Sequence, residues 1–487
     1  MNRHRKTTVS AIFSLFFRLC RVRSMVALQI LLATLANAEK KPNIIYILAD
    51  DLGVGDVGAY GQKLLKTPRI DQLAKEGMRF TQHYSGSSMC APTRSCLLTG
   101  QHTGHTRVRK NGDGPLLDRD VTIGEILRNA GYRTGVIGKW GVGEDGTSGM
   151  PNKQGFDFWY GYLNQGKAHH HYPPFLWRNA EKELYLDNPA KREHYSHDLF
   201  TKEALNFIRE NKEQPFFLYL AYTLVHVDLD VPEDSMKPWI GKVEETKPYG
   251  TPGGQHYIYQ EKPHATFAGM VSRLDRDVGK IVDFVDKLGL AEDTMIIFTS
   301  DNGPTSAGGA DPKFFDGNGD LRGIKFEFYE GGIRCPMIVR WPGRVSPGSI
   351  TDHISAHWDV LPTAAEVAGA KAPEGIDGIS FLPTVLGKSG EQKQHAHLYW
   401  ENPSGTGWQA IRKGKWKAHR RGTRTPDKTT IELFDLSADE AEEKDVSLSF
   451  PQIVTLFDKL FSDARTAPDG KPDELFAPYV PKKKRKK

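Results

Sequence analysis

The chain has 487 residues, of which 38% are hydrophobic and spread along its length. That length indicates one large α/β domain with a smaller one, and the composition argues against intrinsic disorder outside the ends. The formal charge of +5 becomes −7 without the six basic residues before residue 39 and the six at the C-terminal end, so the body's charge does not indicate nucleic-acid binding.

The first 38 residues have the pattern of a cleaved export signal. A basic segment ends at Arg23, the apolar run MVALQILLATLA follows, and Ala36-Asn37-Ala38 provides a cleavage site. This run is too short to span a bilayer, and no later run is long or apolar enough. We therefore expect an exported protein, periplasmic or extracellular, without stable membrane insertion after signal removal. An uncleaved anchor or a buried helix is the alternative, and translation starting at Met25 would shorten the basic segment.

Strand and helix patterns alternate from residue 43 to about 385. Apolar runs predict strands in PNIIYILADD, RTGVIGKW, PFFLYLAYTLVH and TMIIFTSDNG. Helices are predicted at 67–77, with Thr67 as N-cap, at 122–131, with a Thr122/Glu125 capping box, and at 264–288 from apolar spacing. Nearly continuous apolar strands between helices indicate a mostly parallel sheet covered on both faces.

From about residue 390 the pattern changes to short alternating strands, followed by a helix in FPQIVTLFDKLFSDA. We expect a small antiparallel sheet plus helix. The predicted division is a signal at 1–38, a large domain at 39–388, a smaller one at 389–480 and a basic tail at 481–487 that is expected to be disordered. The tail resembles a nuclear-import signal, which conflicts with export. Weak retention on an anionic sulfated polysaccharide is the alternative role.

Reactive side chains follow four of the predicted strands: Asp50-Asp51, Lys139, His226 and Asp301-Asn302. Ligands of open α/β sheets bind beyond the carboxyl ends of the strands, so we expect these side chains to meet at one edge. Three carboxylates and an amide suit a hard cation, Ca²⁺ or Mg²⁺, rather than zinc. The alternative is that they are ordinary strand-end turn residues.

Cys90 is unusual because the chain has few cysteines. Removal of the signal would leave Cys90, Cys96 and Cys335, an odd number, so at least one is unpaired or chemically altered. Cys90 lies just before a helix predicted from Pro92, where free N–H groups and Arg94 favour an anion. Considered alone, it is better explained as a small buried hydrophobic residue, the ordinary role of a lone cysteine.

The segment Cys90-Ala91-Pro92-Thr93-Arg94, followed by SCLLTG, resembles the signature of the formylglycine-dependent, arylsulfatase-like sulfatases of the alkaline phosphatase superfamily. ILADDLGVGDVGAYG, GKW, TSDNG and LRGIKFEFYEGGIRCPMIVRWPG match further family blocks in the same order, from about 43 to 480. The resemblance implies a large mixed, mostly parallel sheet sandwiched by helices, with residues 39–388 catalytic. It also implies that a formylglycine-generating enzyme oxidises Cys90 during export and that the aldehyde hydrate attacks sulfur. Thr93 replaces the more frequent Ser.

Carried over by position, the resemblance implies a role for each reactive residue. The Ca²⁺ ligands would be Asp50, Asp51, Asp301 and Asn302, with the modified Cys90 completing the shell. Arg94 would hold the diol, Lys139 and Lys325 would bind sulfate oxygens, and His226 would act as general acid at the leaving oxygen.

The chain departs from the family pattern at Gly141. Many relatives have GKWHLG where this chain has GKWGVG, so a histidine that assists sulfate release is missing. His105 and the run His169-His170-His171 are candidates to replace it, and His169 is predicted to bind substrate. A subgroup acting on sulfated galactose-type glycans also has the GKWG form. Four aromatic residues would stack on sugars or pack in the core: Trp159, Tyr160, Tyr172 and Trp177.

The predicted function is an exported sulfatase that acts on sulfated galactose- or N-acetylgalactosamine-type glycans. One alternative is a protein that binds sulfated glycans without turnover, and the intact metal set argues against it. A second alternative is a phosphate or phosphonate ester hydrolase on the same scaffold. The two lysines and the arylsulfatase-type blocks favour sulfate.

Overall fold

The computed structural model describes residues 41–253, 256–468 and 472–476. The predicted export signal and basic tail lie outside the described residues. Within the described ranges, no helix combines the length and apolarity needed to cross a membrane.

The larger sheet has the strand order β10-β2-β9-β8-β1-β7-β3-β4-β5-β6, with β11 paired to β2. Its centre, from β8 through β4, is parallel, whereas β9, β5 and β6 pair antiparallel with their neighbours. The strands are β1 Asn43–Ala49, β2 Met78–Tyr84, β3 Arg133–Lys139, β4 Phe158–Tyr162, β5 Phe175–Arg178, β6 Glu181–Leu184, β7 Phe216–Ala221, β8 Thr294–Ser300, β9 Arg334–Arg340, β10 Ser349–Thr351 and β11 Ser355–Ala356.

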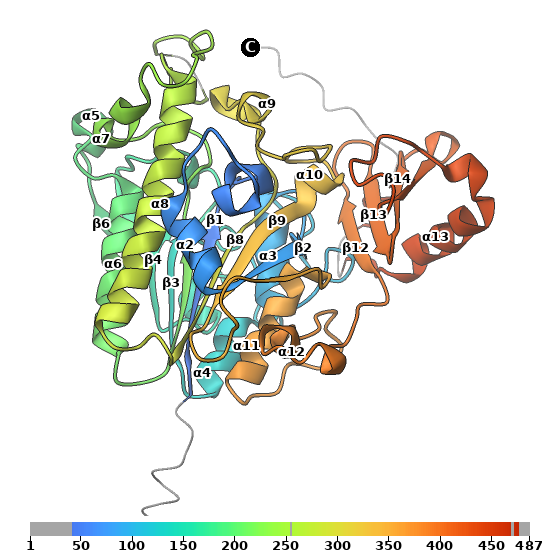
Figure 1. The fold of residues 1–487 in the computed structure, drawn as a ribbon, viewed down its shortest axis with the longest axis horizontal. Coiled ribbons are helices and arrows are strands. Elements are labelled where there is room, and N and C mark those ends of the chain that lie inside the picture. Colours follow the sequence, from blue (N-terminus) through green and yellow to red (C-terminus); the bar gives the residue numbers. More distant parts are fainter. Residues whose placement is uncertain (1–40, 254–255, 469–471, 477–487) are drawn as a thin grey trace, which may run out of the picture. The chain divides into compact units, whose positions relative to one another are not determined.

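Helices cover both faces of this sheet (Figure 1). They are α2 Pro68–Glu76, α3 Cys90–Thr99, α4 Ile123–Asn129, α5 Asn188–Lys191, α6 Ser196–Asn211, α7 Glu233–Met236, α8 Pro263–Lys287, α9 Pro312–Phe315, α10 Glu330–Ile333, α11 Val360–Val367 and α12 Leu382–Val385. Side chains alternate along β1: Ile45 and Ile47 pack with α2, α6 and α8, whereas Ile44 and Tyr46 pack with α3, α4 and α11. Burial on both faces explains why the strand is apolar throughout.

A second, antiparallel sheet follows the large one in the chain, drawn in orange to red in Figure 1. It comprises β12 Leu398–Asn402, β13 Trp408–Lys413, β14 Trp416–Arg421 and β15 Thr430–Asp435, and α13 Pro451–Asp463 packs on it. Leu398, Trp400 and Ala410 of this sheet share a buried apolar cluster with Tyr84 of β2. Beside it, the buried Lys417 donates to Glu330 of α10 at 2.8 Å. The predicted mostly parallel sheet with a smaller antiparallel sheet and helix is confirmed.

The local predictions are confirmed at one helix end and differ from the structure at two other places. The capping box forms, since the Thr122 N–H donates to Glu125 Oε2 at 2.8 Å and the Glu125 N–H to Thr122 Oγ1 at 3.3 Å. Thr67 precedes α2, but its hydroxyl accepts from the Gly58 N–H instead of capping the helix. The strand predicted through His226 ends at Ala221, because the chain beyond it bonds to Asp50: the Asp50 N–H donates to Leu224 O at 2.9 Å.

Candidate active site and metal centre

Two adjacent parallel strands bring four oxygen-bearing side chains together. In the register of β1 and β8, Ala49 lies opposite Ser300, so Asp50-Asp51 and Asp301-Asn302 leave the sheet at the same edge. The Asp51 N–H donates to Asp301 Oδ1 at 3.1 Å, and Asn302 Nδ2 donates to Asp51 Oδ1 at 2.8 Å. Asp51 has a left-handed backbone, with φ of 61°, a strained conformation that is frequent at functional sites.

The N-terminal turn of α3 supplies Cys90 and Arg94, which lie one turn apart on the same helix face. The Cys90 thiol lies 3.5 Å from Asp50 Oδ1. Arg94 Nη2 lies 3.2 Å from Asp50 Oδ2 and 3.0 Å from Asp301 Oδ2, and its Nη1 donates to the Lys139 carbonyl at 2.6 Å. The fully buried guanidinium therefore joins β1, β3 and β8.

Two buried lysines each bond one of the paired aspartates. Lys139, the last residue of β3, donates to Asp50 Oδ2 at 2.6 Å. Lys325 lies between α9 and α10 and donates to Asp51 Oδ2 at 2.8 Å. Their ammonium groups thus reach the cluster from two different parts of the chain.

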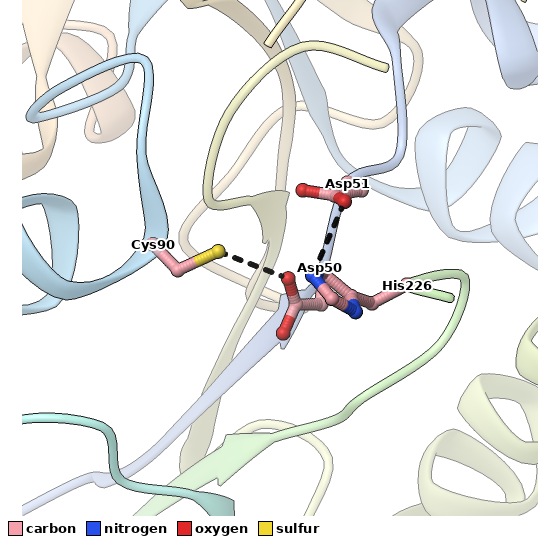
Figure 2. A group of neighbouring side chains, drawn as sticks. All are labelled: Asp50, Asp51, Cys90 and His226. Carbon is pink, nitrogen blue, oxygen red and sulfur yellow. Dashed lines mark hydrogen bonds and ion pairs between the residues drawn. The ribbon is translucent and has the colours of Figure 1, made fainter. Parts of the chain in front are cut away.

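His226 reaches the same group from the loop after β7 (Figure 2). Its Nε2 lies 3.6 Å from Asp51 Oδ2, and its Nδ1 lies 2.5 Å from the Val227 carbonyl. A carbonyl accepts only from a protonated nitrogen, so the ring proton of neutral His226 lies on Nδ1. Nε2, which faces the cluster, is therefore the nitrogen that is free to take up a further proton. One ligand atom from each of Asp50, Asp51, Cys90 and His226 lies within 4.8 Å of the others.

Burial and charge act in opposite directions on this group. Burial opposes ionisation of Asp50, but Lys139 and His226 outweigh it and hold the Asp50 pKa well below its ordinary value. Burial, reinforced by Asp50, raises the pKa of Asp301 to about 7. Burial also raises the pKa of the Cys90 thiol to about 12, so an unmodified Cys90 is not a thiolate nucleophile at neutral pH.

The donor set fits a hard divalent cation. Asn302 Nδ2 donates to Asp51 and to the Gly303 carbonyl, which directs Asn302 Oδ1 away from both, and this buried oxygen has no hydrogen-bond partner. Such an atom suits a metal ligand, because an unsatisfied buried oxygen is otherwise costly. The negative charges of the three aspartates are balanced by the positive charges of Arg94, Lys139 and Lys325. A bound divalent cation would therefore make the net charge of the site positive, and the site would attract an anion.

The predicted histidines separate into two groups. His169 stacks on His226 with ring centroids 4.7 Å apart, whereas His105 lies beyond the other end of α3, where its Nδ1 is 2.9 Å from Asp377 Oδ1. At Gly141, φ is +80° and a Cβ would lie 2.3 Å from Gln165 Nε2. A histidine at that position would therefore need Gln165 to move.

His102, His105 and Asp377 form a second cluster of possible ligands. His102 Nδ1 accepts the Gly104 N–H at 3.1 Å, so the ring proton lies on Nε2, which is 3.3 Å from Asp377 Oδ1. A neutral His102 therefore donates to the carboxylate rather than offering Nε2 to a metal. The cluster is a hydrogen-bonded link between the loop after α3 and the segment that joins α11 to α12.

The aromatic residues proposed for sugar stacking pack inside the fold, with exposures of 9% or less: Trp159, Tyr160, Tyr172 and Trp177. The core-packing alternative is correct for them. Residues that pattern reasoning missed lie beside His169 instead: its ring centroid is 6.0 Å from that of His256 and 5.8 Å from that of Tyr257. They stand in an irregular segment without a periodic pattern, so only the folded chain brings them to the site.

Comparison with known proteins is consistent with this geometry. The sulfatase family model matches residues 42–370, and a model of the N-sulphoglucosamine sulphohydrolase C-terminal region matches 324–463. Human arylsulfatase A is 33% identical over 419 residues, covering 78% of this chain and 75% of that protein. The N-acetylgalactosamine-6-O-sulfatase of Bacteroides thetaiotaomicron is 29% identical over 525 residues, covering 88% and 94%.

Solved structures agree. Ps i-CgsB in complex with k-i-k-neocarrahexaose has a TM-score of 0.73 and 30% identity, covering 88% of this chain and 94% of that one. A phosphonate monoester hydrolase of Agrobacterium radiobacter, at 20% identity and a TM-score of 0.63, shares the fold alone. The fold is that of the alkaline phosphatase superfamily. This chain belongs to the sulfatase family and is a sulfuric ester hydrolase.

Proposed function

We propose that this chain is an exported sulfatase that removes sulfate from galactose- or N-acetylgalactosamine-type glycans, with formylglycine made from Cys90 and a bound Ca²⁺. The observation that carries this proposal is the position of Cys90: it begins α3 and lies 3.5 Å from Asp50, within a cluster of buried carboxylates. The N-acetylgalactosamine-6-O-sulfatase and the neocarrahexaose-bound relative support a sulfated sugar as substrate.

Asp50, Asp51, Asp301 and Asn302 would hold the Ca²⁺, together with the oxygen that replaces the Cys90 thiol. Mg²⁺ is the less favoured ion, because it retains several waters whereas this set supplies most of a shell from the protein. When present, the aldehyde hydrate and the cation supply a nucleophilic oxygen and its electrostatic stabilisation.

The chain's own groups would handle charge and protons. Lys139 and Lys325 would hold the sulfate oxygens, and Arg94 would fix the position of the hydrate from the same face of α3. His226 Nε2 would carry a proton to the leaving sugar oxygen. Burial and the charges of Lys325 and Lys139 keep the His226 pKa well below its ordinary value. A bound sulfate ester would offset those charges and favour the protonated ring.

The decisive experiment is mass spectrometry of the Cys90 peptide from protein made in its own host, with sulfate release measured on the same sample. We expect the thiol to be replaced by an aldehyde or its hydrate, and sulfate release from sulfated galactose that is lost in Cys90→Ala. An unmodified thiol in active protein would contradict the formylglycine. Binding of sulfated glycans without release would contradict turnover.

Export is part of the proposal, with removal of residues 1–38 and modification of Cys90 by a formylglycine-generating enzyme as its steps. N-terminal sequencing of the mature protein, after fractionation of host cells, should find a chain that begins after Ala38. Full-length protein confined to the cytoplasm would contradict export.

A further inference from the structure

Phe326 combines two properties that rarely occur together. Its side chain is 51% exposed, and among the described phenylalanines only Phe476 is also exposed. Its backbone is left-handed, with φ of 76°, a conformation that glycine adopts freely and that a bulky residue adopts only under constraint. Neither property benefits folding, because an exposed ring contributes little burial and the backbone is strained.

Neighbouring segments of the active site hold this conformation. The Phe326 N–H donates to the Ser88 carbonyl at 2.9 Å, two residues before Cys90. The preceding Lys325 N–H donates to the Pro304 carbonyl at 2.9 Å, close to the Asp301-Asn302 pair. Phe326 is therefore fixed between the chain that carries the nucleophile position and the chain that carries two oxygen ligands.

The ring itself lies beside the sulfate-binding lysine. Lys325 Nζ, which bonds Asp51, is 5.6 Å from the centroid of the Phe326 ring. A sulfate held by Lys325 would bring the sugar that bears it close to this half-exposed ring. The buried aromatic residues of the sheet cannot serve this purpose, because they are enclosed in the core.

We propose that Phe326 is a substrate-binding residue whose ring packs against the apolar face of the sugar that carries the scissile sulfate. Galacto-configured pyranoses suit such a surface, because the axial hydroxyl leaves a continuous patch of C–H bonds on the opposite face. Aromatic rings bury such patches favourably. The inference rests on the proposed action on sulfated glycans, and it makes Phe326 a determinant of sugar selectivity rather than of the chemical step.

The test uses calcium-loaded mature protein in the Cys90→Ala background, so that binding is measured without turnover. Calorimetry compares Phe326→Gly with the parent for a sulfated galactose disaccharide, its glucose counterpart and inorganic sulfate. Glycine accepts this backbone conformation, so the variant should melt no lower than the parent. Phe326→Tyr retains the ring, and Phe476→Gly removes a phenylalanine that is also 51% exposed.

We expect Phe326→Gly to weaken galactose-sulfate binding about ten-fold and to bring its affinity close to that of glucose sulfate. Inorganic sulfate should bind as before, because Lys139 and Lys325 remain in place. Phe326→Tyr and Phe476→Gly should match the parent. Unchanged affinity of Phe326→Gly for the galactose disaccharide would overturn the inference. Equal losses of affinity for the disaccharide and for inorganic sulfate would also overturn it, because they would indicate a structural role. So would the absence of measurable binding of either disaccharide to the parent.

Sulfate release by the unmutated enzyme is scored separately. A protein that binds galactose sulfate through Phe326 but releases no sulfate would retain the inference and contradict the proposed turnover. If the unmutated enzyme releases sulfate but Phe326→Gly binds galactose sulfate normally, the proposed turnover is retained and the inference about Phe326 is contradicted.

Discussion

The imidazole rings of His169 and His226 stack with their centroids 4.7 Å apart. His226 directs Nε2 at Asp51, and His169, from the segment before β5, stacks on one face of the His226 ring. Burial, together with Lys139, lowers the His169 pKa to about 4. A neutral His169 can position the His226 ring and accept or donate one hydrogen bond to substrate, but it is not a reservoir of protons at neutral pH.

Different roles for these two histidines predict different kinetic losses. His226→Ala should reduce kcat by about 10²–10⁴-fold on a sugar sulfate. The loss should be much smaller on an aryl sulfate, whose leaving oxygen needs no proton. His169→Ala should mainly raise KM. Steady-state kinetics on both substrates checks this, with His105→Ala as the control that stays close to wild type. Equal losses of His226→Ala on both substrates would contradict the acid role.

Lys139 and Lys325 should both be needed for sulfate binding. Replacing either by alanine should lower kcat/KM by at least about 10²-fold, because a buried charge that faces the reacting group is lost. Inhibition by inorganic sulfate should weaken in parallel. Lys167→Ala, at an exposed lysine of a nearby loop, should change neither quantity. Normal sulfate inhibition in Lys325→Ala would show that this lysine serves Asp51 alone.

Metal removal should destabilise the protein and abolish turnover. At a free cation concentration about 100 times the Kd, metal binding should add about 2.7 kcal/mol to the free energy of unfolding. Ca²⁺ should restore both melting temperature and activity after chelation, whereas Zn²⁺ should not, because the donors are oxygens. Asn302→Leu should weaken Ca²⁺ binding by removing the unpartnered buried oxygen. Asp320→Asn, at an exposed carboxylate, should bind Ca²⁺ normally.

Asp56 should make stability depend on pH. Burial, with Asp316 nearby, raises its pKa from 3.8 to about 8. Between about pH 4 and 8, Asp56 therefore keeps its proton in the folded state but releases it in the unfolded chain. The free energy of unfolding falls as pH rises through that window, by at most about 1.4 kcal/mol per pH unit. Asp56→Asn should flatten the decline, measured as the free energy of unfolding across pH 5–8. Parallel curves for both proteins would mean that Asp56 is ionised when folded.

The pattern of apolar residues along the chain predicted the strands whose ends carry the site. The apolar runs that became β1, β3 and β8 end where the reactive residues begin, because hydrophobic burial stops at the sheet edge. The strand predicted to continue to His226 is five residues too long, because Leu224 and Val225 bond to Asp50 after the end of β1 instead of extending β7. Thr67 is the N-cap residue of α2, as predicted, but its hydroxyl accepts from the Gly58 N–H instead of from the first turn of the helix.

The sequence by itself determined the central strands β1, β3, β7 and β8, the helices α2, α3, α4 and α8, and the acids at the sheet edge, because those depend on spacing along the chain. Only the tertiary structure decided which histidine lies at the site and which aromatic residues are enclosed. It also placed Lys325 on Asp51, 274 positions away in the chain, and Phe326 in a strained, exposed conformation beside it. Such pairings depend on strand register and loop closure, which bring together groups whose separation in sequence carries no periodic signal.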